Sequence, residues 1–349
     1  MNDARAGDGG YDGYLANANT LAGKFKDLGT RIAFVTTSPE ERYEAGAPAG
    51  SNYNNMLLKY SDGLRTVSME TSNFFVDQIR PMIEVIEAGR RAKVLGEAAN
   101  PRLIPDGVHL NWGGQLVTAT GILKGLNAPT LVSSVEIDAK ETTNYKVKAV
   151  NAKVTPHPIA IRPAPGAAAT TAPIEFERLD NALPWPVLIT TETTLAQNIS
   201  GFTPMQDLSR YDLKVTNLTA PKYEVRIDNV VAGTYSKEEI GAGINFSRAP
   251  GPVQDQAQAL IKQILQKNDL FFNRWRGIQI YSIPAWLHTP EAEALRAKEV
   301  ARLDTQIADA EKEINTLRQP VVHTWIVNPL PAEGAAPAPT SALVVPAVM

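Results

Sequence analysis

The spacing of apolar residues predicts alternating helices and strands over the first 128 residues. Apolar side chains recur every three or four positions in four stretches, which predicts helices at Tyr14–Leu28, Asn52–Leu64, Asn73–Arg91 and Gly113–Leu126. A short, continuously apolar and β-rich run at Ile32–Thr37 predicts a strand covered on both faces, and Thr66–Met69 is the next candidate strand. This order is typical of one half of a doubly wound α/β/α layer structure.

The pattern changes near Thr130. Apolar and polar residues alternate in five segments separated by Asn, Asp, Gly and Pro, namely Leu131–Asp138, Tyr145–Val154, Ile174–Arg178, Tyr211–Val215 and Lys222–Ile227. Asp228 and Asn229 fit the turn of a hairpin. A Pro/Ala-rich loop, Thr155–Pro173, interrupts the segments. Residues 131–250 are therefore predicted to form an antiparallel, β-rich accessory module.

Helical periodicity returns in residues 251–320. One helix is expected at Gln256–Trp275, and Thr289 followed by Pro290 is a typical helix start. From Val300 to Leu317 an apolar seam follows a three-four spacing, which fits packing within the chain or against a partner helix. Leu330–Met349 is rich in Pro and Ala, which predicts a disordered tail.

Composition excludes several classes of protein and site. The 349 residues have a formal net charge of −3 with scattered lysines and arginines, which argues against a nucleic-acid partner. The absence of cysteine excludes disulfides, thiolate metal sites and a cysteine nucleophile. No apolar stretch approaches the length of a membrane span, and the first 30 residues lack the pattern of a signal peptide.

A Pro/Gly-rich loop at Leu103–Gln115 carries the candidate chemistry. Asp106 and His109 lie three residues apart in it, just ahead of a predicted helix. In such a turn Asp106 can accept a hydrogen bond from His109 Nδ1–H, which leaves Nε2 free to act as a general base. The alternative is a polar turn in which the aspartate caps the following helix.

This loop resembles the last sequence block of the SGNH (GDSL-like) esterases, in which Asp-x-x-His lies in a loop leading into the final helix. Met1-Asn2-Asp3, followed by a helix-like segment and by Arg31–Pro39, is similar to the Gly-x-Asn-Asp block of that family without its glycine. The resemblance implies ester hydrolysis by a Ser-His-Asp mechanism, with His109 as base, Asp106 as its orienting partner and Asn2 as an oxyanion donor. For Asn2 the alternative is a frayed terminus.

The resemblance also implies an N-terminal truncation. The family's serine lies upstream in a Gly-Asp-Ser block, and neither that block nor the family's oxyanion glycine occurs in these 349 residues. Ser38, Ser51, Ser68 and Ser72 lie in residues 1–130, but none has the sequence context of a nucleophile turn. We therefore expect a partial SGNH-type (flavodoxin-like) three-layer core at residues 1–130, with no nucleophile and impaired activity as given.

No other constellation points to a cofactor. His157, His288 and His323 do not group with carboxylates at metal-ligand spacing, so we expect neither a metal site nor a cofactor.

The expected substrate is a small-molecule or glycan ester. The alternative function is a non-catalytic pseudo-hydrolase that binds a glycan or a partner. An exposed sheet edge or the seam at residues 300–317 are candidate surfaces for an oligomer. Full-length relatives in the family are often exported, and the compartment of this chain stays open.

Overall fold

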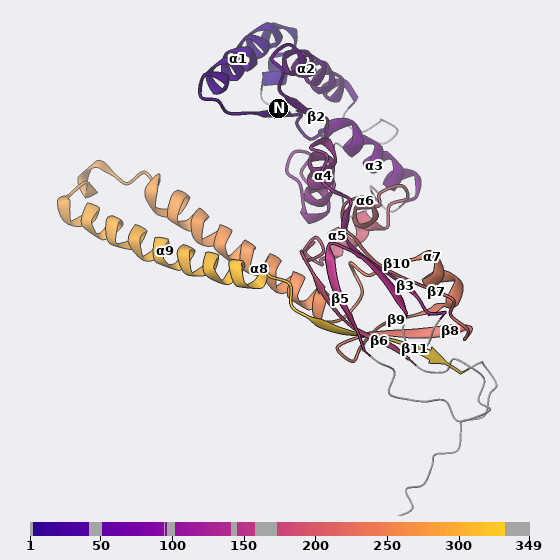
Figure 1. Cartoon of the computed structure of the whole chain (residues 1–349). Helices are drawn as coiled ribbons and strands as arrows, with labels where there is room; N and C mark the ends of the chain where they lie inside the picture. The colour runs from indigo at the N-terminus through magenta and orange to yellow at the C-terminus, as the bar shows by residue number, and fades with distance from the viewer. Residues whose placement is uncertain are drawn as a thin grey trace, which may run out of the picture. The chain divides into compact units, whose positions relative to one another are not determined.

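The computed structural model describes residues 3–41, 51–93, 95, 102–140, 145–157 and 173–331. The chain forms two compact units, each of which is discontinuous in sequence. Unit 1 comprises Met1–Val132, Ala182–Tyr211 and Val253–Pro320, and unit 2 comprises Ser133–Asn181, Asp212–Pro252 and Val321–Met349. Figure 1 shows the helices and strands of both units, with labels on many of them. Asn2, residues 158–172 of the predicted loop and residues 332–349 of the predicted tail lie outside the described residues.

A pair of parallel strands lies at the centre of the N-terminal part of unit 1. β1 (Ala33–Val35) pairs with β2 (Phe74–Val76), with Phe34 opposite Phe75. A short 3-10 helix (Asp3–Ala6) precedes α1 (Asp8–Asp27), and α2 (Ser51–Glu70) lies between the strands in sequence. The buried residues of this core come from α1, β1 and α2: Ala18, Ala22, Phe34, Leu64 and Val67.

The predicted strand at Thr66–Met69 is wrong, because α2 continues through these residues to Glu70. Val67 and Ser68 are buried on the helix face that also buries Leu64, so the helical period continues past the predicted end. The second strand, β2, lies instead at the start of the stretch predicted as one helix. The short run Phe74–Val76 supplies that strand, and the helix α3 begins only at Ile79.

A second apolar core in unit 1 joins segments far apart in sequence. It contains α3 (Ile79–Arg91), α4 (Trp112–Gly125), α5 (Thr191–Gln197) and the loop ahead of α4. Its buried side chains include Met82, Ile86, Leu103, Ile104, Leu116, Ala196, Ile199 and Phe202. Residues 182–211, which include α6 (Pro204–Leu208), were expected in the β-rich module and instead cluster with unit 1. Their apolar side chains pack against α3 and α4, which explains this difference.

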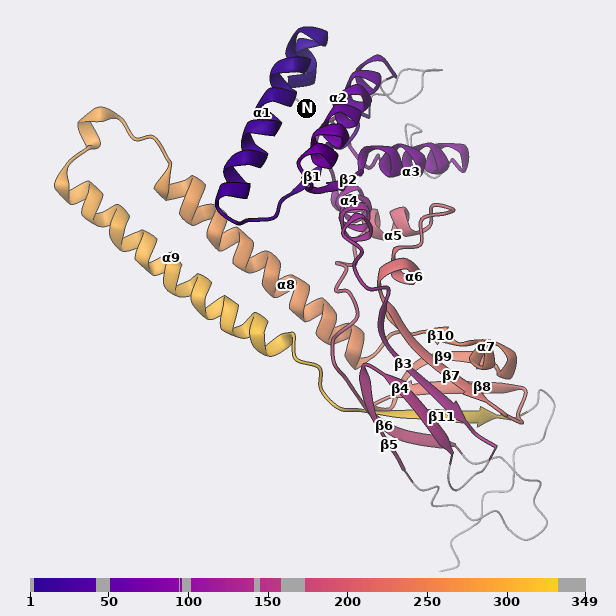
Figure 2. The ribbon, with the colours of Figure 1, turned by 45° about the horizontal axis from the view of Figure 1, so that its top comes forward.

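Two long helices complete unit 1 as an antiparallel pair, which we call the arm (Figure 2). α8 (Pro252–Phe272) runs into a π-helical segment (Asn273–Gln279), and a 3-10 turn (Ala285–Leu287) precedes α9 (Pro290–Leu317). Thr289 caps α9 by accepting a hydrogen bond from the Ala292 amide, as predicted from Thr-Pro. Within the predicted seam of α9, Leu303 and Ala310 are buried.

Unit 2 is a sandwich of two sheets. One sheet has the order β10-β7-β3-β4, and the other β5-β6-β11-β8-β9. The strands of the first sheet are β3 (Leu131–Asp138), β4 (Lys146–Val150), β7 (Arg210–Thr216) and β10 (Ile244–Asn245). The second sheet contains β5 (Ala152–Pro156), β6 (Ile174–Asp180), β8 (Lys222–Ile227), β9 (Val230–Ser236) and β11 (His323–Leu330), and α7 (Lys237–Ala242) follows β9.

A buried arginine links the two sheets. Arg178 on β6 is bound by Asp180, donates to Ser133 on β3 and stacks on the ring of Trp325. The predicted hairpin at Asp228–Asn229 is confirmed, since both residues have positive φ between the antiparallel strands β8 and β9. The predicted strand Tyr145–Val154 is two strands, because Asn151 adopts a positive φ of 56° between β4 and β5. None of the described helices is long and apolar enough to cross a membrane.

Candidate functional site

The structure brings Asp106 and His109 together, as their spacing predicts. His109 Nδ1 lies 2.6 Å from Asp106 Oδ2, and Asp106 Oδ1 accepts hydrogen bonds from the backbone amides of Val108 (2.9 Å) and His109 (2.7 Å). Gly107 allows this tight turn with a φ of 86°. With the carboxylate facing Nδ1, the expected tautomer carries its proton there and leaves a lone pair on Nε2.

Hydrogen bonding keeps the aspartate ionised. The backbone amide of His109, its imidazole and the amide of Val108 together hold the pKa of Asp106 well below its usual range. Both side chains are exposed, His109 by 84% and Asp106 by 57%. The pair is therefore a solvent-accessible imidazole whose Nδ1 faces a carboxylate with a lowered pKa, an arrangement compatible with a general base.

The loop that carries this pair is anchored to the core on both sides. Leu103 and Ile104 are buried, and Asn111 begins α4 as its N-cap by accepting from the Gly114 amide. The Asn111 side chain also donates to the Arg102 carbonyl at 2.7 Å. A methyl group on Gly114 would lie 2.5 Å from the Leu103 carbonyl oxygen. The glycine pair in the sequence therefore permits α4 to start directly against the loop.

A buried carboxylate that the sequence analysis did not single out also holds the loop. Glu41 is fully buried, and its Oε2 accepts a hydrogen bond from the Ile104 amide at 2.9 Å. Its own amide donates to the Gly107 carbonyl at 3.2 Å. Burial raises the pKa of Glu41, while the Ile104 amide and Arg90, 3.9 Å away, oppose that rise. Glu41 thus forms hydrogen bonds with the loop at residues 104 and 107, on either side of Asp106.

The segment after β1 is in turn fixed to α2. Asn54 accepts from the Glu40 amide at 2.8 Å and donates to the Glu40 carbonyl at 2.9 Å, and both residues are buried. These two hydrogen bonds satisfy the backbone N–H and C=O of Glu40, as pairing with a neighbouring β-strand would. Glu41 is the next residue, so the fixed backbone of Glu40 also helps to position the Glu41 carboxylate.

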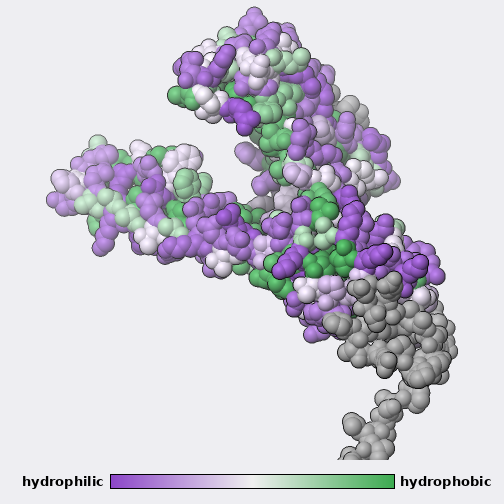
Figure 3. Space-filling view, in the orientation of Figure 1, coloured by the Kyte–Doolittle hydropathy of each residue, from purple (hydrophilic) through white to green (hydrophobic). Residues whose placement is uncertain are grey.

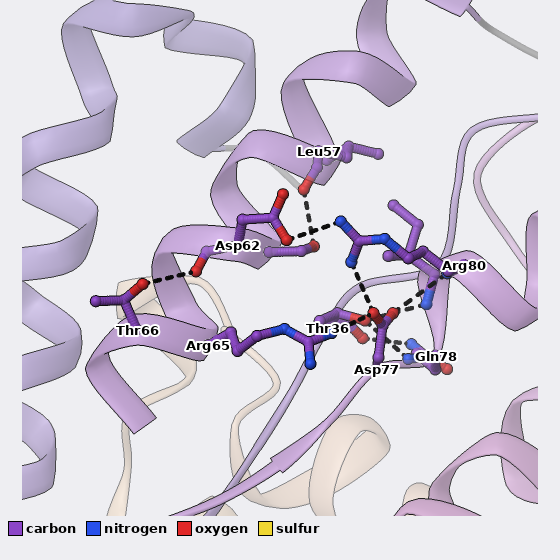
Figure 4. A network of polar contacts seen from close by, with 10 residues as sticks. Thr36, Leu57, Asp62, Arg65, Thr66, Asp77, Gln78 and Arg80 are labelled. Atoms are coloured by element: carbon purple, nitrogen blue, oxygen red, sulfur yellow. Dashed lines mark hydrogen bonds and ion pairs between the residues drawn. The ribbon is translucent and has the colours of Figure 1, made fainter. Parts of the chain in front are cut away.

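A polar network ties the ends of both parallel strands to the adjacent helices (Figure 4). Thr36, just after β1, accepts through Oγ1 from the amides of Gln78 and Ile79 at the start of α3. Asp77, just after β2, binds the guanidinium groups of Arg65 and Arg80. The segments at the carboxyl ends of the two strands are therefore tied to α2 and α3 by hydrogen bonds and ion pairs, at a position where sites of α/β proteins collect.

A hollow of about 170 Å³ lies beside the end of β1. Its lining comes from the N-terminal segment, α1, α2 and β1: Ala4, Tyr14, Val35, Thr36, Thr37, Leu57, Tyr60, Ser61 and Leu64. Asn2, the predicted oxyanion donor, lies outside the described residues, two positions before Ala4. Its predicted role therefore stays a prediction.

Asp106 is the candidate residue to which the His109 side chain hydrogen bonds. In the described part of the chain no serine hydroxyl hydrogen bonds to His109, and Ser68 is buried with its hydroxyl donating to Asn73. The remaining histidines each lie beside a different carboxylate: His157 beside Glu175, His288 beside Glu293 and His323 beside Asp228. Within the described ranges no three potential metal ligands come together.

Comparison with known proteins identifies the fold. No protein-family model and no curated protein sequence matches the chain. A solved structure of a gut microbial diltiazem-metabolizing enzyme superposes on 93% of this chain and 78% of its own length, with a TM-score of 0.69 and 19% identity. The chain therefore has the fold of that structure, which confirms the predicted α/β class.

A second solved structure is similar over a smaller part of the chain. It is a point mutant of an acetyl-xylooligosaccharide esterase from Geobacillus Stearmophilus, with 23% identity over 37% of this chain and 57% of that chain. Its TM-score of 0.29 is too low to indicate a shared fold.

Proposed function

We propose that this chain carries the histidine–aspartate part of a carboxylic-ester hydrolase of the SGNH type. The observation that supports it best is the short contact between His109 Nδ1 and Asp106 Oδ2, in an anchored loop directly ahead of a helix. The fold shared with an enzyme described as metabolizing diltiazem adds support at the level of architecture. Residues 1–130, joined by residues 182–211, would carry the chemistry, and the β-rich and arm segments would be accessory.

In the proposed reaction, His109 Nε2 takes the proton from a serine hydroxyl while the Asp106 carboxylate stabilises the imidazolium through Nδ1–H. The serine oxygen attacks the ester carbonyl, and donors that include Asn2 hold the negative oxygen. His109 then protonates the departing alcohol, which leaves an acyl-enzyme. Water, deprotonated by His109, releases the acid and restores the serine. In this proposal the serine comes from a Gly-Asp-Ser block encoded upstream of Met1.

The decisive experiment extends the reading frame upstream and compares ester hydrolysis by the longer protein with that of its variants. We expect His109→Ala to lower kcat by about 10⁴-fold or more, because removal of the base of a triad removes most of the rate enhancement. His288→Ala, an exposed histidine paired with Glu293 on the arm, is the matched control and should leave kcat unchanged. Equal activity of both variants would refute the proposed role of His109.

The 349-residue chain provides a second test. We expect it to hydrolyse short-chain p-nitrophenyl esters no faster than its own His109→Ala variant, since the proposed nucleophile is not part of it. Robust turnover that depends on His109 would show that a serine within the chain acts as nucleophile, and Ser38, just after β1, would be the first residue to replace. An upstream frame without a Gly-Asp-Ser block would favour the pseudo-hydrolase alternative.

A further inference from the structure

The positions of Asp106 and His109 depend on the backbone of their loop. Hydrophilic residues cover much of the surface that Figure 3 shows. The side chains of Asp106 and His109 are likewise open to solvent, with exposed fractions of 57% and 84%. An exposed side chain has few neighbours to lock its rotamer, so its direction follows from the backbone that carries it. A group that fixes this backbone therefore also fixes the contact between the two side chains.

Asp106 is the third residue of a tight turn at residues 104–107. The Gly107 amide donates to the Ile104 carbonyl at 3.0 Å, which closes a four-residue β-turn. Pro105 occupies the second position, where its fixed φ suits a turn of this kind. The amide of Ile104 and the carbonyl of Gly107 take no part in the hydrogen bond of the turn. Both groups therefore need partners elsewhere.

Glu41 provides both of these partners. Its Oε2 accepts from the Ile104 amide at 2.9 Å, and its own amide donates to the Gly107 carbonyl at 3.2 Å. One residue, 63 positions before Ile104, thus closes a ring of hydrogen bonds with both ends of the turn. The preceding residue is bonded through its backbone to Asn54 on α2, so the ring is tied to that helix.

Packing alone does not account for a carboxylate at position 41. The Glu41 side chain is fully buried, and among the residues that the structure describes its Oε1 has no hydrogen-bond partner. The nearest guanidinium nitrogen of Arg90 lies 3.9 Å from this oxygen. Burial of a polar atom without a hydrogen bond costs free energy, and an apolar side chain would fill the same space without that cost. What the carboxylate adds is the hydrogen bond to the turn.

We propose that Glu41 is the positioning residue for Asp106 and His109. By fixing both ends of the turn at residues 104–107, it holds the Asp106 carboxylate in the direction of His109 Nδ1. Glu41 acts through the turn and takes no part in proton transfer. The inference rests on the proposed function only for its effect on catalysis, because the contact between Asp106 and His109 can be measured without a nucleophile.

NMR of the 349-residue chain tests this geometry in the absence of turnover. In Glu41→Leu the turn can open, so the pKa of Asp106 should rise toward its usual value and the hydrogen-bonded Nδ1–H signal of His109 should be lost. Glu41→Gln keeps an acceptor for the Ile104 amide, so both signals should stay close to those of the native chain. The control for lost stability is Val67→Ala, which shortens a buried side chain in the core around β1 and should move neither signal.

Kinetics of the protein extended upstream test the consequence for ester hydrolysis. A displacement of a catalytic group by about 1 Å can lower the rate by about 10²-fold. We therefore expect Glu41→Leu to lower kcat by about 10- to 100-fold with little change in KM, because the turn positions the base and not the substrate. Glu41→Gln should restore most of the native kcat, which a merely space-filling role would not predict.

The outcomes separate the positioning role from the proposed function. A folded Glu41→Leu chain with the native Asp106 pKa and His109 signal would overturn the positioning role, as would an equal change in Val67→Ala. If Glu41→Leu does not fold, Glu41→Met, which keeps the length of the side chain, replaces it. Failure of both variants to fold would assign Glu41 to the stability of the fold alone. An inactive extended protein whose Asp106 pKa still depends on Glu41 would refute ester hydrolysis and support the positioning role.

Discussion

Replacing Glu41 tests how the loop that carries Asp106 and His109 is held. Glu41→Leu removes the only side-chain oxygen that accepts from the Ile104 amide in the described structure, and it keeps an apolar side chain of similar size in the buried site. Glu41→Gln is the matched variant, because its amide oxygen can still accept that hydrogen bond. Both variants remove the negative charge that lies 3.9 Å from Arg90, so this loss cancels when they are compared.

The difference between the two variants can be worked out from this geometry. A buried backbone N–H left without an acceptor costs about 1–3 kcal/mol, whereas a retained neutral hydrogen bond costs little. We therefore expect the free energy of unfolding of Glu41→Leu to be lower than that of Glu41→Gln by about 1–3 kcal/mol. Chemical denaturation of both variants measures this difference, and hydrogen exchange at the Ile104 amide shows whether protection is lost at the same bond.

The pH dependence gives an independent check. Burial raises the pKa of Glu41 above its ordinary value, so the folded chain retains a proton that the unfolded chain releases. The stability contributed by this proton is present below the ordinary pKa and is lost as the pH rises through the raised one. The native chain should therefore lose stability relative to Glu41→Gln over that window. Parallel pH profiles, or equal stability of the leucine and glutamine variants, would refute the reasoning.

Two further predictions concern the same loop. Gly114→Ala should destabilise the chain by about 1–3 kcal/mol, because the new methyl group meets the Leu103 carbonyl oxygen at 2.5 Å. The control is Gly13→Ala on α1, where the space is open and no destabilisation is expected. Thermal unfolding of both variants measures the difference. Carbon-detected NMR titration should find the pKa of Asp106 well below its usual range. In His109→Ala that pKa should rise only in part, since the backbone donors at residues 108 and 109 remain; a full return to the usual value would contradict the assigned cause.

The local parts of the fold and of the site could be predicted from the sequence. Asp106 and His109 are three residues apart, so a single turn decides their contact, and the hairpin at Asp228–Asn229 depends only on residues that tolerate positive φ. The strands at Leu131–Asp138 and Lys222–Ile227 have the predicted bounds, because alternation there continues up to turn residues at each end.

The long-range parts could not be predicted from spacing. Glu41 contacts Ile104 across 63 positions, and nothing in its neighbourhood distinguishes it from the adjacent glutamate. The prediction of a strand at Thr66–Met69 is wrong, because β-branched and apolar residues also suit the last turn of a buried helix. Residues 182–211 belong to unit 1, although the strands that flank them in sequence belong largely to unit 2, and the contacts of Ile199 and Phe202 in the second apolar core decide that assignment.

The central position of β11 has a consequence for the order in which the chain folds. Trp325 pairs with Phe176 on one side and with Ile227 on the other, so the last described strand completes a sheet whose other members were synthesised far earlier. Until it arrives, β6 and β8 each expose an edge with free amides and carbonyls, which invites pairing with another chain. Contacts of such long sequence separation form slowly. During synthesis on the ribosome, both helices of the arm are made before β11, so this sheet can form its central strand only after the arm has been synthesised.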